Sequence, residues 1–350
     1  RADDVLISYF FNENASFAWI ASDDFLKIIK IETPLNEIKL SVMKIKESLI
    51  AENPYELIPF DDVASRFLYE AILSPLMQDI KNKKNLIVVK NDLLKQLPLS
   101  VLITNKKKEK TWLFQKYDIV SIEKSSDLIQ KPSVKNIDKF YGFGMPIPKD
   151  NYGKLPNSKK ELIALGKGYS ARNRNLFLGS SSTKENLSSI NLNGAALAFS
   201  THAIRPLEVR DIKGPALLLE DWLSAKEIAF DLSLNANLVI LSACNTAWSS
   251  NPYQEPVLDL PTAFIISGSQ SILVSNWNIE DRATKDIMAS ASNYIYENRG
   301  KENLILDALR VGMNEYLEEN EDKFFNSRTG RLSKAHPYFW APFELVGIPQ

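Results

Sequence analysis

The sequence is poor in the residue types that most often build disulfides and metal sites. Its 350 residues include one cysteine and two histidines. A single cysteine excludes an internal disulfide and fits a reducing compartment such as the cytoplasm. One thiol and two imidazoles give no zinc-binding spacing, so we expect no metal site.

An excess of charge, long apolar runs and phosphate-binding loops are also missing. The 42 basic and 43 acidic residues leave a formal net charge of −1, so no overall field draws the chain to nucleic acid or to an anionic membrane. No apolar stretch approaches the roughly 20 residues of a membrane span. The glycines at residues 141–144 lack the third member of a dinucleotide fingerprint. We therefore expect no cofactor, no nucleic-acid partner and no membrane span.

What is present is a pair of short apolar runs, each followed by a reactive side chain. Residues 197–201 and 238–241 are almost without charge and do not alternate, as is typical of strands buried on both faces of a parallel sheet. His202 follows the first run and Cys244 follows the second. If the two strands are parallel neighbours, both side chains lie at the carboxyl edge of the sheet, where function gathers in open α/β folds.

A thiol beside an imidazole can act as a nucleophile. The imidazole raises the thiolate fraction of Cys244, the thiolate attacks a carbonyl carbon, and His202 as imidazolium protonates the leaving amine. The other interpretation is that Cys244 is a small core residue, which is the commonest role of a lone cysteine. The strand-end position and the matching histidine favour the nucleophile, a signal that is weak by itself.

The residues around this pair resemble a known family. Ser200-Thr-His202 and Leu241-Ser-Ala-Cys-Asn-Thr246 are similar to the paired motifs of the CHAT family, the caspase-like and separase-related cysteine peptidases often joined to tetratricopeptide repeats. Further blocks follow in the family's order at residues 93–102, 155–162, 275–284 and 336–343. The resemblance implies an α/β fold with a caspase-like, mostly parallel sheet flanked by helices and an N-terminal α/β supporting, pseudo-protease-like layer.

Carried over residue by residue, the resemblance implies a catalytic pair and an oxyanion hole. Cys244 would be the nucleophile and His202 its acid/base partner. The backbone N–H groups of Ala203 and Cys244 would bind the oxyanion. The family usually has glycine after the histidine, and Ala203 departs from this pattern because alanine adopts a positive φ only at a cost.

The resemblance also implies a peptide-binding groove. A third apolar run at residues 271–275 leads into it, so Ser275, Asn276 and Trp277 would line a groove in which substrate binds as an added strand. Asp281 is the candidate floor of the first specificity pocket, where a carboxylate would favour arginine or lysine. The other interpretation of Asp281 is an N-cap for a helix starting near Arg282.

The chain is long enough for two domains. We place the boundary near residue 135, with residues 1–135 as an α/β supporting or pseudo-protease-like region and residues 136–350 as the catalytic domain. Within the first region we predict strands at residues 4–11, 17–20 and 25–31, and further strands at 86–89 and 100–103. Two helices are predicted at residues 35–51 and 61–80, and we expect Pro75 to bend or break the second. Residues 318–335 are predicted as a loop, and His336 as part of a structural aromatic cluster.

The sequence therefore predicts a cysteine endopeptidase that cuts a protein partner after a basic residue. We expect its regulation by an upstream or associated module. An inert or latent scaffold on the same fold is the alternative, and an acyltransferase or amidase acting on a small molecule is a third. Because the sequence begins at Arg1 and not at methionine, we expect a fragment of a longer protein or a processed chain, with helical repeats as one form of a missing upstream region.

Overall fold

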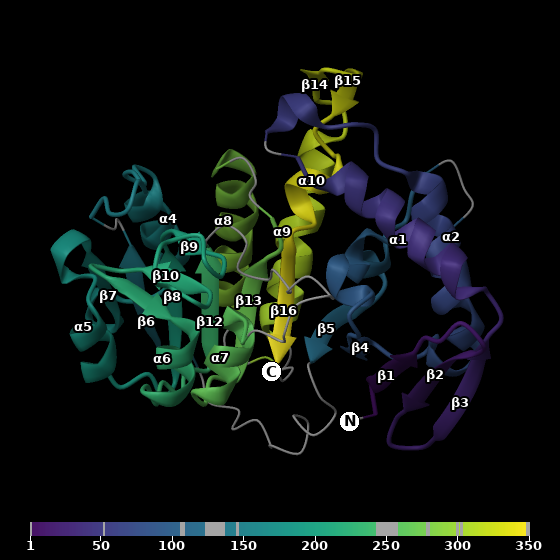
Figure 1. Ribbon diagram of the computed structural model, residues 1–350, viewed down its shortest axis with the longest axis horizontal. Helices are drawn as coiled ribbons and strands as arrows, with labels where there is room; N and C mark the ends of the chain where they lie inside the picture. Colours follow the sequence, from purple (N-terminus) through teal and green to yellow (C-terminus); the bar gives the residue numbers. More distant parts are fainter. Residues whose placement is uncertain are drawn as a thin grey trace. The chain divides into compact units, whose positions relative to one another are not determined.

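The computed structural model describes residues 2–51, 53–105, 109–122, 137–144, 147–242, 258–277, 281–298, 301 and 304–347. The chain forms two compact units (Figure 1). The first comprises Arg1–Ile129 with Met313–Glu344, and the second comprises Gln130–Gly312 with Leu345–Gln350. The boundary predicted at residue 135 falls outside the described residues. No helix of the described ranges is long and apolar enough to cross a membrane.

The first unit contains a mixed sheet with the order β3-β2-β1-β4-β5. β1 pairs in parallel with β4, and β4 with β5, whereas β2 is antiparallel to both β1 and β3. The predicted strands at residues 4–11, 17–20, 25–31 and 86–89 are therefore confirmed. The bounds of the five strands are Asp4–Phe10 (β1), Ser16–Ala21 (β2), Leu26–Ile31 (β3), Asn85–Val89 (β4) and Asp118–Ile122 (β5).

The helices of the first unit follow the predicted pattern, with a break at Pro75. α1 presents a buried stripe that includes Ile38, Val42 and Ile45, at the spacing of one helix face. Pro75 cannot donate a backbone hydrogen bond, so α2 ends before it and a 3₁₀ turn leads into α3. The bounds are Leu35–Leu49 (α1), Asp62–Ile72 (α2), Met77–Ile80 (α3) and Pro337–Trp340 (α10).

Two predictions for this unit are wrong. The predicted strand at residues 100–103 is a 3₁₀ turn over Leu99–Val101. The segment predicted as a loop at residues 318–335 contains the end of α9 (Leu304–Asn320) and an antiparallel hairpin of β14 (Phe324–Ser327) and β15 (Gly330–Ser333). Gly330 has a φ of +129°, which glycine adopts readily.

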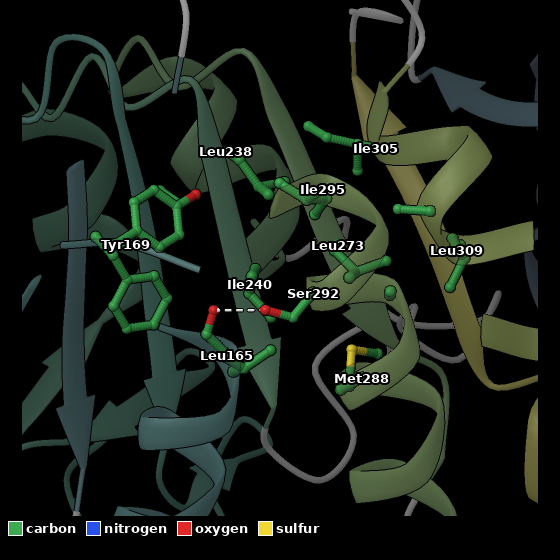
Figure 2. Close-up of a pocket in the computed structure, with 14 residues that line it drawn as sticks. Leu165, Tyr169, Leu238, Ile240, Leu273, Met288, Ser292, Ile295, Ile305 and Leu309 are labelled. Atoms are coloured by element: carbon green, nitrogen blue, oxygen red, sulfur yellow. Dashed lines mark hydrogen bonds between the residues drawn. The ribbon is translucent and has the colours of Figure 1, made fainter. Parts of the chain in front are cut away.

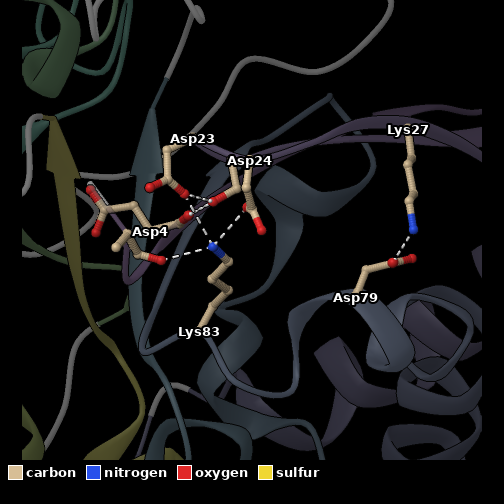
Figure 3. A network of polar contacts seen from close by, with 8 residues as sticks. Asp4, Asp23, Asp24, Lys27, Asp79 and Lys83 are labelled. Carbon is tan, nitrogen blue, oxygen red and sulfur yellow. Dashed lines mark hydrogen bonds and ion pairs between the residues drawn. The ribbon is translucent and has the colours of Figure 1, made fainter.

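A lysine ties the amino-terminal hairpin to the start of β4 (Figure 3). Lys83 Nζ donates to the carbonyl oxygen of Ala2 at 2.8 Å and lies 3.3 Å and 3.2 Å from the carboxylates of Asp23 and Asp24. Hydrogen bonding from the Ser22 hydroxyl, followed by the nearby Lys83 cation, holds the pKa of Asp23 below its usual value. These contacts fix the turn between β2 and β3, and we assign them a structural role.

The second unit contains a parallel sheet with the order β13-β12-β8-β6-β7. Every neighbouring pair in this series is parallel, including β8 with β12, the two apolar runs predicted to be neighbours. The carboxyl ends of these strands therefore meet at one edge. The bounds are Lys139–Gly144 (β6), Arg174–Leu178 (β7), Ala195–Ser200 (β8), Leu238–Ser242 (β12) and Ser271–Ser275 (β13), with β16 at Phe343–Gly347.

Helices pack on both faces of this sheet (Figure 1). One core contains alternate strand residues such as Phe199 and Val239 together with Ile228 of α6 and Phe264 of α7. α6 begins with a capping box, in which Ser224 and Glu227 bond each other's backbone N–H. α4 and α8 cover the other face. The helix bounds are Ser158–Leu165 (α4), Lys184–Ser189 (α5), Ala225–Phe230 (α6), Leu260–Ile266 (α7) and Asp281–Glu297 (α8).

A small antiparallel sheet follows β8 directly. Its order is β11-β10-β9, with bounds Trp222–Ser224 (β11), Ala216–Leu218 (β10) and Ala203–Ile204 (β9). β9 begins one residue after His202, so this sheet fixes the backbone on the far side of the candidate acid/base residue. The small sheet therefore belongs to the surroundings of the site.

Candidate active site

The strands that precede His202 and Cys244 end in register. Ser200, the last residue of β8, pairs with Ser242, the last residue of β12. His202 follows Ser200 by two residues, and Cys244 follows Ser242 by two residues. Cys244 lies outside the described residues, so its side chain is placed here by its sequence position alone. His202 is half-buried at the carboxyl edge of the sheet, as predicted.

The imidazole of His202 is oriented by a backbone carbonyl. Its Nε2 lies 2.9 Å from the carbonyl oxygen of Gly153. A carbonyl can only accept a hydrogen bond, so Nε2 carries the proton and, in the neutral ring, Nδ1 holds the lone pair. The ring of Tyr152 lies against the imidazole, with centroids 5.2 Å apart. The arrangement leaves Nδ1 as the basic nitrogen.

The turn that supplies this carbonyl is held by the small sheet. Asp150 has a positive φ of 50°, and its carboxylate accepts a hydrogen bond from Trp222 Nε1 at 2.6 Å. Trp222 packs edge-on against Tyr152 at 5.2 Å. Lys149 forms an ion pair of 2.7 Å with Asp221, and this lysine, followed by the Trp222 backbone N–H, keeps the pKa of Asp221 below its usual value. Three contacts thus anchor the turn beside His202.

Tyr152 remains a neutral phenol over a wide pH range. Its hydroxyl donates to Glu208 Oε1 at 2.9 Å. Burial, followed by this carboxylate, raises the pKa of Tyr152 to about 12. The ring that lies on His202 therefore carries no charge at physiological pH.

Ala203 adopts the extended conformation of β9 and needs no positive φ. Leu218 N donates to His202 O at 2.9 Å, which makes His202 and Leu218 a hydrogen-bonded pair. In an antiparallel ladder, hydrogen-bonded pairs alternate with pairs whose N–H and C=O groups point away from the partner strand. Ala203, opposite Leu217, belongs to the second kind, so its N–H points away from β10. Alanine at this position therefore does not incur the conformational cost of a positive φ.

The predicted groove residues lie at the end of β13, next to β12. Val274 pairs with Leu241, so Ser275 continues the row that contains Ser242. The Ser275 hydroxyl donates to the carbonyl oxygen of Trp277 at 2.7 Å. Ser275 and Trp277 are buried and Asn276 is half-buried. Their contact with a substrate stays a prediction.

Asp281 is the first residue of α8, so the helix begins one residue earlier than predicted and Asp281 belongs to its first turn. The side chain of Asp281 lies outside the described part of the chain. Its role as a selector of basic residues therefore stays a prediction.

The second histidine has the structural role predicted for it. His336 is 7% exposed, and its Nε2 donates to the carbonyl oxygen of Ile58 at 3.0 Å. Its Nδ1 accepts from the backbone N–H of Tyr338 at 3.1 Å and thereby caps α10. Burial lowers the pKa of His336 to about 4. Phe60 packs edge-on against the ring at 6.1 Å.

Sequence reasoning did not identify Glu161 as a site residue. Its carboxylate accepts from the hydroxyl of Ser200 at 2.6 Å through Oε2 and from the hydroxyl of Ser242 through Oε1. One glutamate on α4 therefore contacts the last residue of both strands that lead to the candidate pair. The signal in the sequence was the serine placed two residues before both His202 and Cys244.

The profile of the CHAT domain matches residues 62–348. The chain belongs to the CHAT family. The resemblance to this family is thereby confirmed, and the match covers the His202 strand, the Cys244 segment and the C-terminal block. No curated protein sequence matches the chain.

Solved structures place this CHAT domain in the caspase-like fold. Gingipain R of Porphyromonas gingivalis, an Arg-specific cysteine proteinase, is similar over 90% of this chain and 74% of its own, with a TM-score of 0.51 and 9% identity. Separase of Saccharomyces cerevisiae, in complex with securin, is similar over 99% of this chain and 30% of its own, with a TM-score of 0.60 and 9% identity. The chain thus spans less than a third of the separase chain. The predicted caspase-like α/β fold is confirmed.

An apolar cavity lies within the second unit (Figure 2). It lies between the face of the parallel sheet, at Leu238 and Ile240, and the helix residues Met288 and Leu309. Its volume of about 30 Å³ holds at most a few water-sized molecules. The hydroxyl of Ser292, which lines it, donates to the Leu165 carbonyl oxygen at 3.1 Å.

Proposed function

We propose that this CHAT domain is a cysteine endopeptidase in which Cys244 is the nucleophile and His202 the acid/base partner. The observation that carries the proposal is the register of β8 and β12, whose last residues pair with each other two residues before His202 and Cys244. Adjacent strands are about 4.8 Å apart, so equal offsets from a paired row favour an encounter of the two side chains. The Gly153 carbonyl supports the tautomer that can accept the thiol proton.

Acylation would proceed as follows. The Cys244 thiol transfers its proton to His202 Nδ1, and the thiolate attacks the carbonyl carbon of the scissile peptide bond. The N–H groups of Ala203 and Cys244 stabilise the negative charge that develops on the carbonyl oxygen. The imidazolium then donates its proton to the leaving amine as the C–N bond breaks, and a thioester to Cys244 remains.

Deacylation would use the same groups. Neutral His202 takes a proton from water, and the resulting hydroxide attacks the thioester carbon. The C–S bond breaks, the thiolate recovers a proton from His202, and the carboxylic acid product leaves. The sequence of steps consumes one water for each peptide bond.

Specificity and regulation complete the proposal. Asp281, in the first turn of α8, would bind an arginine or lysine side chain of the substrate through a charge-assisted contact. The substrate would be a protein segment bound as an extended strand beside Ser275, Asn276 and Trp277. Separase is similar to this chain and is bound to securin in its structure, which suggests regulation by an associated protein or an upstream module. A reducing, cytoplasmic setting would keep Cys244 as a thiol.

The test is cleavage of a diverse peptide library, with products identified by mass spectrometry. Wild-type protein should cut after arginine or lysine. Cys244→Ala should abolish cleavage, and His202→Ala should lower its rate by about 10² to 10⁴. Asp281→Asn should reduce the preference for basic residues without abolishing cleavage. Ser292→Ala, which removes a hydroxyl of α8 bonded to the carbonyl oxygen of Leu165, is the matched control and should leave the rate unchanged.

Each result decides one part of the proposal. Cleavage that persists in Cys244→Ala would refute the nucleophile. Cleavage by the dyad with no basic preference would refute the role of Asp281. Silence of the wild-type protein, alone and with its associated proteins, would favour the alternative of an inert scaffold.

A further inference from the structure

The Glu161 carboxylate joins the two strands that lead to His202 and Cys244. Ser200 Oγ donates to Oε2 at 2.6 Å, and Ser242 Oγ donates to Oε1. Both bonds are charge-assisted, because the acceptor is a carboxylate, and such bonds are about twice as strong as neutral ones. Glu161 lies in the first turn of α4, where the helix dipole favours a negative charge.

The position of this bridge matters because it joins the two strands just before the candidate pair. Ser200 and Ser242 are the final residues of β8 and β12, and they pair with each other. His202 and Cys244 follow this pair by two residues. A change in the separation of Ser200 and Ser242 is therefore carried to both side chains. A displacement of about 1 Å between reacting groups can lower a rate by about 10².

We propose that Glu161 is a positioning residue that holds the ends of β8 and β12 at the separation the His202–Cys244 pair requires. The inference rests on the proposed function, since it assigns to Glu161 a role in that same pair. Glu161 acts through Ser200 and Ser242 and does not itself touch the substrate.

The seat of α4 is built for this contact. The Ser158 hydroxyl, one turn before Glu161, donates to the carbonyl oxygen of Ser200 at 2.6 Å. Gly144 of β6 pairs with Ser200, and a Cβ atom there would lie 2.3 Å from Ser158 Oγ and 2.7 Å from Leu162 Cδ1. The absence of a side chain at Gly144 thus lets the helix approach the strand ends. In the first turn of α4, Ser158 thus contacts the backbone of Ser200 and Glu161 contacts its side chain.

A positioning role and a purely electrostatic role of Glu161 predict opposite effects on the Cys244 thiolate. If Glu161 acts by charge alone, its removal stabilises the Cys244 thiolate, and removal of the Ser242 hydroxyl changes nothing. If it acts by positioning, loss of either partner separates Cys244 from the imidazolium that stabilises its thiolate. The thiol then approaches the ordinary cysteine pKa of about 8.5.

The experiment measures alkylation of Cys244 by iodoacetamide as a function of pH. Because Cys244 is the single cysteine of the 350-residue chain, the reaction reports on this thiol alone and needs no substrate. Glu161→Ala and Ser242→Ala should each raise the midpoint of the pH–rate profile by about one unit. The double variant should shift it no further than Glu161→Ala alone, because the two residues form one contact. Ser292→Ala should leave the midpoint unchanged.

The outcomes separate this inference from the proposed function. An unchanged midpoint in His202→Ala would refute the pair itself. A midpoint that rises in His202→Ala but not in Glu161→Ala or Ser242→Ala would overturn the positioning role and keep the pair. A lower midpoint in Glu161→Ala would show a charge effect and also overturn it. Ser242→Ala removes one hydroxyl, and circular dichroism of both variants would identify any loss of fold.

Discussion

The two histidines of this chain lie in different units and show how surroundings divide one side chain type between two roles. His336, in the first unit, uses both ring nitrogens, and burial lowers its pKa to about 4. His202, in the second unit, is half-buried, and its Nε2 donates to Gly153. Within the described residues, Nδ1 of His202 has no hydrogen-bond partner. A histidine with both nitrogens bonded supports a fold, whereas one with a single oriented nitrogen can move protons.

Two glutamates, one in each unit, also differ in their surroundings. Glu344 of the first unit accepts from the hydroxyl of Ser121 and forms an ion pair of 2.5 Å with the buried Lys90. Glu161 of the second unit accepts from two serine hydroxyls. Lys90 thus neutralises the first carboxylate within the core, and the hydroxyls of Ser200 and Ser242 hold the second at the edge of the sheet.

The largest expected effect is the loss of the lysine that neutralises Glu344. Lys90→Met removes the cation that lies 2.5 Å from a carboxylate that is only 10% exposed, which should lower the free energy of unfolding by about 3–5 kcal/mol. Urea denaturation measures the change. The double variant Lys90→Met/Glu344→Leu removes both charges and should recover most of the loss. A cost below about 1 kcal/mol for Lys90→Met would contradict the structural role of this pair.

The pH dependence of stability tests the difference between the histidines. His336 has a pKa of about 4 when folded and about 6.5 when unfolded, so between these values the unfolded chain binds the proton. The free energy of unfolding should therefore fall by about 3 kcal/mol as the pH decreases from 6.5 to 4. Above pH 6.5, the contribution of His336 to the free energy of unfolding is fully present. Urea titrations at several pH values measure this slope.

His336→Asn is the matched control for that slope. Asparagine is a favoured N-cap residue and does not titrate, so the variant should lose the contribution of this group to the pH dependence. The same slope in His336→Asn and in wild type would assign the pH dependence to other groups.

The smallest effect should come from Gly144→Ala, which tests the seat of α4. The added Cβ meets Ser158, Leu162 and the Ser200 carbonyl oxygen, at 2.9 Å in the last case, so we expect a loss of about 1–3 kcal/mol. The Cys244 alkylation profile should shift in the direction expected for Glu161→Ala. Gly214→Ala adds a Cβ with no neighbour within 4 Å and should change stability by less than about 0.5 kcal/mol. Equal effects of both substitutions would contradict the close approach at Gly144.

The parallel core was predictable because its signal is local in sequence. The apolar runs that became β8 and β12 have no charge to place on a solvent face, and a polar residue follows each run. The 3₁₀ turn at Leu99–Val101 was not predictable from its β-branched residues. The hydroxyl of Ser65 on α2 accepts from Ile103 N at 2.9 Å and donates to Val101 O at 2.8 Å. A side chain from another element thus takes the bonds that a strand partner would have made.

The hairpin of β14 and β15 was missed for a related reason. Its strands are short and mostly exposed, so they carry little hydrophobic pattern. Contacts from a distant segment hold it, including Arg328 N to Tyr55 O at 2.7 Å and Thr329 Oγ1 to Leu57 O at 3.1 Å.

The candidate pair could be predicted from sequence, but its support could not. His202 and Cys244 each stand after a recognisable strand. Glu161 reaches Ser200 and Ser242 across 39 and 81 residues, and nothing in the local sequence specifies such contacts. The carbonyl of Gly153 is 49 residues from His202 and carries no side-chain signal at all.

That carbonyl makes the orientation of His202 robust to mutation. Every amino acid supplies the same backbone oxygen, so no substitution at position 153 deletes the acceptor. A Cβ at Gly153 would meet no atom within 4 Å, which leaves room for other residues there. Homologous sequences can therefore vary at this position without a visible trace of the contact. A survey of sequence conservation would overlook the group that holds the imidazole, and deletion or insertion in residues 149–153 is the change that would reveal it.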